Sequence, residues 1–310
     1  MKSRILWCTS FAICWATLLL VAATRSFAFA NLLVQLAIFL PFANIPAWRD
    51  NRLSYVDFAW PAGLVAIGVQ LVPFAEARTT PALALAGIYV LVGLRMAIWA
   101  SQLYRPGVLK RDLPRYAYQR QRWARAGFRS ERFSVQYEIL VQAMANTSFL
   151  AVPAYLVATD ASRAFGAWAG ACIALWLAAY AFESVADLQK RRFARSEAAR
   201  RDAVCDVGLW RYSRHPNYFG QWLQWIALVA FAAPSLLALR GEVHVAALVV
   251  LALSLAWVVY VMYGTLVYYT GAVPAEHYSR RKRPAYADYQ ATVNRFFPGP
   301  RRAMSGQAVP

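Results

Sequence analysis

The sequence predicts an all-α polytopic membrane protein, a bundle of about eight transmembrane helices with both termini in the cytoplasm. Of its 310 residues, 60% are apolar, and eight apolar runs have about the 20 residues that a helix needs to cross a bilayer. A soluble domain of this size would be less apolar. The net charge of +18 lies in short blocks between these runs, which is typical of membrane loops rather than of a nucleic-acid-binding surface.

The eight apolar runs follow one another with short polar connections. They lie near Ile5–Thr24, Phe27–Trp48, Phe58–Ala75, Pro81–Ala100, Glu138–Ala158, Ala164–Phe182, Gln221–Leu239 and Val243–Tyr269. The first run also resembles a secretory signal peptide, since Ala28-Phe29-Ala30 has the small residues of a cleavage site. Its long apolar stretch and Arg25, which interrupts the would-be cleavage region, favour a retained helix.

The distribution of Lys and Arg predicts the orientation of the bundle. With both termini inside, the cytoplasmic segments carry 28 basic residues and the extracytoplasmic loops carry 4. This asymmetry is a strong positive-inside signal. The basic residues are 29 Arg and 4 Lys, a bias typical of GC-rich bacterial genomes. We therefore expect a bacterial inner-membrane protein whose active site faces the cytoplasm.

The sequence argues against a protein-bound metal and against the two common nucleotide motifs. The four cysteines and three histidines show no metal-ligand spacing, and no HExxH or CxxC occurs. Neither GxGxxG nor GxxxxGK[ST] is present. A bound nucleotide would have to lie among helix ends and loops.

Several ionisable groups lie in or beside the apolar runs, where a charge is costly unless it is paired or functional. Arg95 could snorkel from the fourth run, and Asp57 could cap the third. Glu183 and Asp187 share one helical face and precede a basic run that begins at Lys190. This ladder could be a set of surface ion pairs, or an acid for a ribose or nicotinamide beside cations for a phosphate.

The stretch Gly208–Trp225, GLWRYSRHPNYFGQWLQW, is the least typical of a membrane loop. It combines Arg, His, Asn and Tyr side chains at the expected boundary between cytosol and bilayer, where one or two anchoring residues would suffice. It closely resembles the signature of steroid 5-alpha-reductase-like membrane proteins, in particular their bacterial branch of DUF1295 oxidoreductases. FESVADLQKRRF and RRKRPAYADYQATVNRFFP support the resemblance, with weaker matches at VDFAW and LRMA.

The resemblance covers about Tyr55 to Pro298. It implies a membrane domain at 55–298 with a cytoplasmic cofactor pocket, preceded by transmembrane helices at 1–54 and followed by a flexible tail at 299–310. The implied activity is NADPH-dependent reduction of a carbon–carbon double bond conjugated to a carbonyl, in a steroid, sterol or other lipid-like substrate that enters from the bilayer.

The resemblance also implies which residues contact NADPH. They are Asn217 and Tyr218 at the nicotinamide, Asp187, Lys190 and Arg191 near the adenosine and phosphates, Arg211, Arg214 and His215 as phosphate or amide donors, Arg283, Tyr286 and Tyr289 from the C-terminal block, and Tyr212 and Gln221 within the central motif. At Gln221 the family has Glu. An amide can still form hydrogen bonds there but cannot donate a proton as an acid.

Hydride transfer to an enone also needs a hydrogen-bond donor at the carbonyl, where negative charge develops. Tyr55, Asp57 and Tyr116 are the candidate catalytic residues, because they border the first cytoplasmic loops. In the steroid reductases an acid and a Tyr in the N-terminal half have this role.

Two alternatives remain open. Isoprenylcysteine and phospholipid methyltransferases carry a related RHPxYxG motif that binds S-adenosylmethionine, although the ADLQK flank and Gln221 favour the reductase. The chain could also be a non-catalytic lipid-binding relative that keeps the fold.

Overall fold

The computed structural model describes residues 2–103, 112–128 and 130–303. Every regular element within those ranges is a helix, apart from one isolated bridge between Arg240 and Val243. The predicted all-α fold is therefore confirmed. Of the predicted tail, residues 304–310 lie outside the described residues, as does part of the Arg-rich loop, residues 104–111.

Six helical segments of the described chain are long and apolar enough to cross a membrane. They are Ala22–Asp50, Val56–Phe74, Thr80–Ser101, Glu131–Ala158, Ala167–Ala194 and Val245–Lys282. They correspond to six of the eight predicted runs and indicate an integral membrane protein. The first run is a shorter apolar helix, Leu6–Leu20, and the seventh is the 17-residue helix α11, Pro216–Ala232. The count of eight and the orientation stay predictions.

Two helices continue well beyond the apolar runs that predicted them. The sixth apolar run ends at Phe182, whereas helix α9 (Ala167–Ala194) continues to Ala194. The eighth apolar run ends at Tyr269, whereas the helical segment passes through a π-turn and ends at Lys282. Apolar composition marks only the part that suits lipid, while Arg, Lys, Glu and Gln favour continuing the helix into water.

The chain divides into two compact units. Unit 1 contains Met1–Gly170 and Leu228–Val258, and unit 2 contains Ala171–Ala227 and Val259–Pro310. The helices wholly within unit 1 are α1 (Lys2–Leu20), α2 (Ala22–Phe39), η1 (Leu40–Asn44), α3 (Ile45–Asp50), α4 (Val56–Phe74), α5 (Thr80–Leu103), α6 (Pro114–Arg125), α7 (Glu131–Thr147), α8 (Val152–Ala158) and η4 (Ala233–Leu236).

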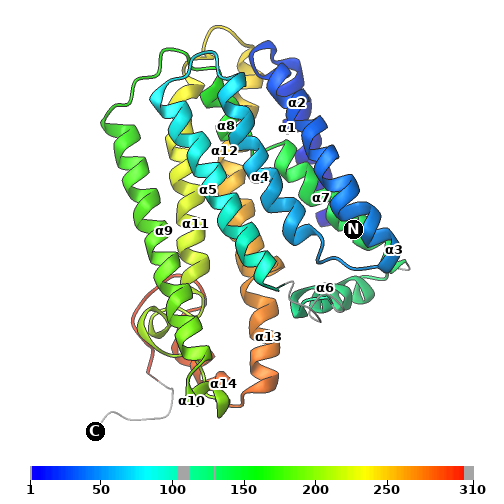
Figure 1. Cartoon of the computed structure of the whole chain (residues 1–310), viewed down its shortest axis with the longest axis vertical. Helices are drawn as coiled ribbons and strands as arrows, with labels where there is room; N and C mark the ends of the chain where they lie inside the picture. The colour runs from blue at the N-terminus through cyan, green and yellow to red at the C-terminus, as the bar shows by residue number, and fades with distance from the viewer. Residues whose placement is uncertain (1, 104–111, 129, 304–310) are drawn as a thin grey trace. The chain divides into compact units, whose positions relative to one another are not determined.

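Helices α4 and α5 form the most extensive pair of unit 1 and run side by side (Figure 1). Helix α2 packs against α1, α4 and α7. Helix α8 is wholly buried and contacts α2, α4 and α5. These contacts make α4 the central helix of the unit, so the residues at its ends are held on a well-packed element.

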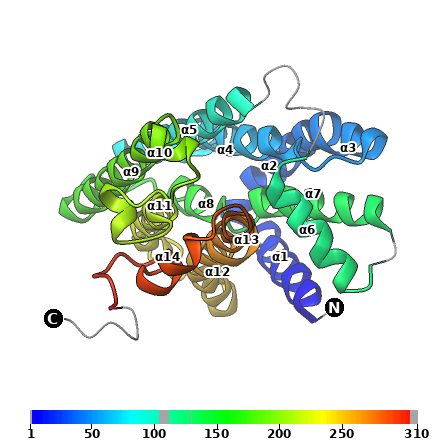
Figure 2. The ribbon, with the colours of Figure 1, turned by 90° about the horizontal axis from the view of Figure 1, so that it is seen from below.

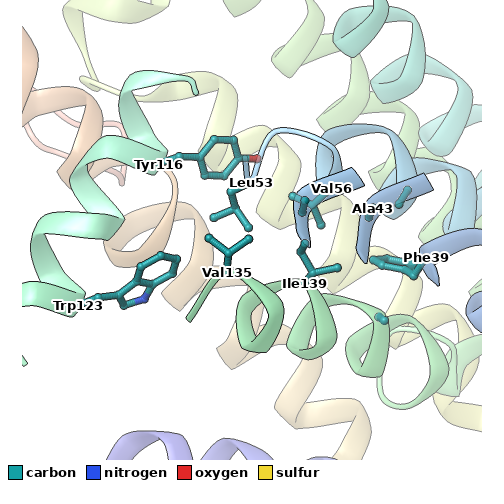
Figure 3. Packing of buried hydrophobic residues seen from close by; sticks show 11 residues of the cluster. Phe39, Ala43, Leu53, Val56, Tyr116, Trp123, Val135 and Ile139 are labelled. Carbon is teal, nitrogen blue, oxygen red and sulfur yellow. The ribbon is translucent and has the colours of Figure 1, made fainter. Parts of the chain in front are cut away.

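Helix α6 is amphipathic and crosses the directions of its neighbours (Figure 1). Its buried residues Tyr116, Gln119 and Trp123 recur at helical spacing, so they share one face. That face packs on α7, beside which α6 lies in Figure 2. Tyr116 and Trp123 thereby join an apolar cluster with Leu53 and Val135 (Figure 3).

A buried network of amide side chains joins α2, α4, α7 and α8 within unit 1. Asn31 donates to the hydroxyl of Tyr155 (2.7 Å), and Gln35 donates to Asn31 Oδ1 and to the carbonyl of Gly63 (both 3.0 Å). Asn146 donates to Gln35 Oε1 (3.3 Å). Such interhelical hydrogen bonds hold membrane helices together where apolar contact alone discriminates poorly. The amides reach α4 because Gly63 has no side chain.

We expect Gly63→Ala to destabilise the protein. A Cβ at this position would collide with the amide groups of Gln35 and Asn146. Overpacking of this kind costs about 1–3 kcal/mol. The matched control is Gly87→Ala in α5, where an added Cβ meets nothing within 4 Å. Thermal unfolding in detergent should show a lower transition for Gly63→Ala than for Gly87→Ala, and equal transitions would contradict this role of Gly63.

Unit 2 is formed mainly by α9, the first part of α11, and the C-terminal block. Its shorter elements are α10 (Glu197–Arg200), η3 (Gly208–Arg211), η5 (Thr265–Tyr269), α13 (Ala272–Lys282) and α14 (Tyr286–Thr292), and the last residues of α12 (Val245–Gly264) also belong to it. Helices α9 and α11 approach closely at Gly220, where an added Cβ would lie 2.9 Å from the backbone nitrogen of Glu183. A glycine is needed at this crossing.

Candidate functional site

The central motif begins by docking onto the end of α9. The indole of Trp210 donates to the carbonyl of Ala186 (2.9 Å), and the amide oxygen of Gln189 accepts from the backbone of Leu209 (2.9 Å). Gly208 has φ +54° and lies directly against the Gln189 side chain. A glycine suits this position both by its left-handed backbone and by the space.

The C-terminal block is bound to the same motif by backbone hydrogen bonds and by one side-chain hydroxyl. Arg214 N–H donates to the carbonyl of Asn294 (2.8 Å), and Gly299 N–H donates to that of Tyr212 (3.0 Å). The Ser213 hydroxyl donates to the carbonyl of Phe296 (2.9 Å). The two sequence blocks that carry the family resemblance therefore form one structural element, which extends through Gly299 into the segment predicted as a tail.

The buried carboxylate of Glu276 is the point at which these segments converge. Its Oε1 accepts from Arg214 Nε (2.8 Å) and lies 3.2 Å from His215 Nε2. Its Oε2 accepts from Arg214 Nη2 (3.3 Å), Gln290 Nε2 (3.0 Å) and Arg295 Nε (3.3 Å). The other terminal nitrogen of Arg214, Nη1, donates to the carbonyls of Gln290 in α14 and of Val293, which follows α14. Arg214, predicted as a phosphate or amide donor, is engaged inside the protein here.

His215 is buried and its ring lies parallel to that of Tyr218, with the centroids 5.2 Å apart. Burial lowers the pKa of His215, and the charges of Lys190 and Arg214 lower it further, whereas Glu276 opposes the shift. The net direction is downward, so His215 is neutral at pH 7. A neutral ring can stack on Tyr218 without burying a cation.

We expect this protein to lose stability as the pH falls below about 6.5, the pKa of His in an unfolded chain. Because the folded pKa of His215 is the lower one, the unfolded state binds the proton more readily, and stability present above pH 6.5 is lost on acidification. The slope approaches about 1.4 kcal/mol per pH unit. Denaturation at pH 7.5 and 5.5 should show a smaller difference in His215→Gln than in a control, His244→Gln, in which an exposed histidine is removed.

The amide of Asn217 on α11 contacts the carboxylate of Asp187 on the adjoining helix α9. Asn217 Nδ2 donates to Asp187 Oδ1 (3.1 Å), and the buried Oδ1 of Asn217 has no hydrogen-bond partner among the described residues. One turn further along α9, Lys190 Nζ lies 4.3 Å from the centroid of the Trp210 ring. Asp187 and Lys190 of α9 therefore each contact a residue of the central motif.

The predicted residues of the C-terminal block lie beside this set. Tyr286 and Tyr289 are buried, and burial raises the pKa of both hydroxyls, so they stay protonated. Tyr289 donates to the carbonyl of Trp210. The buried Nε of Arg283 has no acceptor within the described part of the chain. Its charge acts on Lys190, which places both cations in one region.

The other predicted cofactor residues are less enclosed. Arg191, Arg211 and Tyr212 are exposed, and Gln221 is half-buried on the first turns of α11. The structure leaves these side chains accessible to solvent or ligand. Their cofactor roles stay predictions.

The three candidate catalytic residues lie in unit 1, where Asp57 and Tyr116 come together. The Tyr116 hydroxyl donates to Asp57 Oδ1, and Arg115 pairs with the same oxygen. Asp57 Oδ2 is buried and has no partner among the described residues. Burial raises the pKa of Tyr116 well above its ordinary value, so this phenol keeps its proton.

Tyr55 lies outside this pair. Its hydroxyl donates to Asp50 Oδ2 (2.6 Å) at an exposed position, and burial together with the Asp50 carboxylate raises its pKa. The structure therefore joins two of the three candidates and separates the third from them.

Glu276 and Arg115 did not emerge from the sequence. Glu276 has Arg280 four residues later on the same helix, a spacing that suggests an ordinary surface ion pair. Arg115 was one of many arginines in a basic loop. The available sequence signal for Glu276 was that it is one of two acids, with Asp288, in the basic stretch of residues 271–302.

Fold and site together define a helical integral membrane protein whose central motif and C-terminal block form one polar, Arg- and Tyr-rich element. The chain belongs to the DUF1295 family, described as a protein of unknown function, whose model matches residues 42–293. The DUF1295 part of the resemblance is thereby confirmed. Uncharacterized protein C594.04c of Schizosaccharomyces pombe is 24% identical over 278 residues, covering 82% of this chain and 75% of its own. No solved structure matches the chain.

Proposed function

We propose that the protein is an NADPH-dependent reductase of the steroid 5-alpha-reductase-like type. It acts on a conjugated carbon–carbon double bond in a lipid-like substrate that enters from the bilayer of a bacterial inner membrane. The observation that carries the proposal is the buried Oδ1 of Asn217, which has no hydrogen-bond partner in the part of the chain that the structure describes. It lies beside Asp187, within the motif that resembles the cofactor site of those reductases.

The residues of unit 2 fit a nicotinamide dinucleotide phosphate. A free amide oxygen such as Asn217 Oδ1 can accept an N–H from the carboxamide of the cofactor. Lys190 and Arg283 bring two cations together, and the Nε–H of Arg283, which has no acceptor among the residues described, suits an anionic oxygen. Tyr286 and Tyr289 supply aromatic walls with protonated hydroxyls.

When bound, NADPH would supply the hydride that adds to the β-carbon of the enone. The protein then has to stabilise negative charge on the carbonyl oxygen. Tyr116 is suited to this because its phenol stays protonated. Its single O–H, which is donated to Asp57 in the structure, would have to turn from Asp57 Oδ1 to the carbonyl oxygen of the substrate. Addition of a proton from water to the α-carbon completes the reaction and would give a saturated ketone and NADP⁺.

The same features bear on the two alternatives. A methyltransferase would bind S-adenosylmethionine through His215 and a downstream acid, and Glu276 is bonded to His215. However, both oxygens of Glu276 already accept from protein side chains, which leaves no place for the ligand. A non-catalytic relative would bind neither cofactor.

Thermal unfolding of the purified protein with NADPH, NADH or S-adenosylmethionine tests the proposal. A ligand at 100 times its dissociation constant adds about 2.7 kcal/mol of stability. We expect NADPH to raise the unfolding temperature of the wild-type protein and to leave that of Asn217→Ala unchanged. A matched control, Asn44→Ala, removes an amide bonded to Gln136 in unit 1 and should keep the shift. Stabilisation by S-adenosylmethionine would support methyl transfer, and no shift with any ligand would support the non-catalytic relative.

A further inference from the structure

Glu276 differs from the candidate cofactor residues in having no capacity left for a ligand. Oε1 has two side-chain partners and Oε2 has three. The side chain is 4% exposed. A carboxylate in this condition cannot contact a bound molecule, so any effect that it has on binding must pass through the side chains it holds.

One of those side chains is His215, whose ring stacks on Tyr218, a residue of the proposed cofactor site. A carboxylate oxygen accepts only, so the neutral ring of His215 must carry its proton on Nε2 to bond Glu276. This contact fixes the tautomer and the plane of the ring. The ring plane of His215 lies within 1° of that of Tyr218, which follows in the next turn. Tyr218 therefore rests against a ring whose orientation Glu276 sets.

We propose that Glu276 is a positioning residue that acts on the cofactor through His215 and Tyr218. The inference rests on the proposed function, since it concerns the site at which NADPH would bind. Arg214 keeps the carboxylate of Glu276 in place, because it donates hydrogen bonds to both of its oxygens. Glu276 thus couples α13 to the orientation of an aromatic ring on α11.

The first experiment needs no ligand. The chain has only three histidines, so ¹⁵N-histidine labelling with His244→Gln and His277→Gln assigns the signals of His215. We expect a single Nε2–H tautomer in the wild type and a mixture of tautomers in Glu276→Leu, which removes the acceptor that an amide oxygen would keep. Glu276→Asp keeps the charge but withdraws the carboxylate by one methylene, and serves if the Leu variant fails to fold. An unchanged tautomer in a folded variant would overturn the proposal.

The second experiment is a double-mutant cycle on NADPH affinity. We expect Glu276→Leu to weaken binding by about tenfold or more, a typical size for coupled neighbours, and to have no further effect in a Tyr218→Ala background. A merely structural role would give equal factors in both backgrounds, and that additivity would overturn the proposal. If the wild type binds no NADPH, the proposed function fails, while the tautomer experiment still decides whether Glu276 orients His215.

Discussion

Arg214→Ala should lower the free energy of unfolding by about 3–5 kcal/mol, the cost of breaking a buried ion pair by removing one partner. Arg214 is 7% exposed, and its guanidinium bonds both oxygens of Glu276, which is 4% exposed. It also donates to the carbonyls of Gln290 and Val293. Removing it leaves a buried carboxylate less compensated and two carbonyls without their donor.

Denaturant titration in detergent micelles measures this effect. The matched control is Arg280→Ala, an exposed arginine on the helix that carries Glu276, and should change stability by no more than about 0.5 kcal/mol. If the two arginine variants unfolded at the same denaturant concentration, the Glu276 cluster would not hold the central motif to the C-terminal block.

Tyr116→Phe should lower the turnover of an enone lipid by a factor of about 10²–10³, the usual loss when one donor to a developing oxyanion is removed. The substitution keeps the ring, which packs in the apolar cluster with Leu53 and Val135, and deletes only the hydroxyl that donates to Asp57. Stability should therefore change far less than activity.

The assay follows NADPH oxidation with cholest-4-en-3-one as the probe. Tyr118→Phe, on the same helix but outside its buried face, is the control and should retain activity. The NADPH-dependent thermal shift should persist in both variants, because Tyr116 is assigned to the carbonyl and not to the cofactor. Loss of that shift in Tyr116→Phe, or full activity without the hydroxyl, would remove Tyr116 from the proposed chemistry.

The helical class was predictable because it depends on composition and run length, which the bilayer constrains directly. The ends of α9 and α13 could not be predicted in this way. An apolar run ends where the lipid is expected to end, whereas the helix continues beyond it. The break between α7 and α8 was also hidden, since one apolar run covers both.

The sequence predicted many of the residues of the candidate site but not which of them contact one another. The motif that contains Asn217 and His215 was evident as an unusual density of polar and aromatic groups. Glu276 was hidden, because its partners Arg214 and His215 precede it by more than 60 residues. Asp57 and Tyr116 were each singled out, but they lie 59 positions apart in the sequence and no local pattern relates the two.

The sequence by itself therefore determined that the chain is a helical membrane protein and which polar blocks set it apart. Both properties are local, since they depend on residue type and spacing along the chain. Only the tertiary structure decided that Arg214 is turned inward onto Glu276 and that Tyr116 bonds Asp57. A buried charge must find its partner wherever the packing brings one, and neither burial nor partner is encoded at the residue itself.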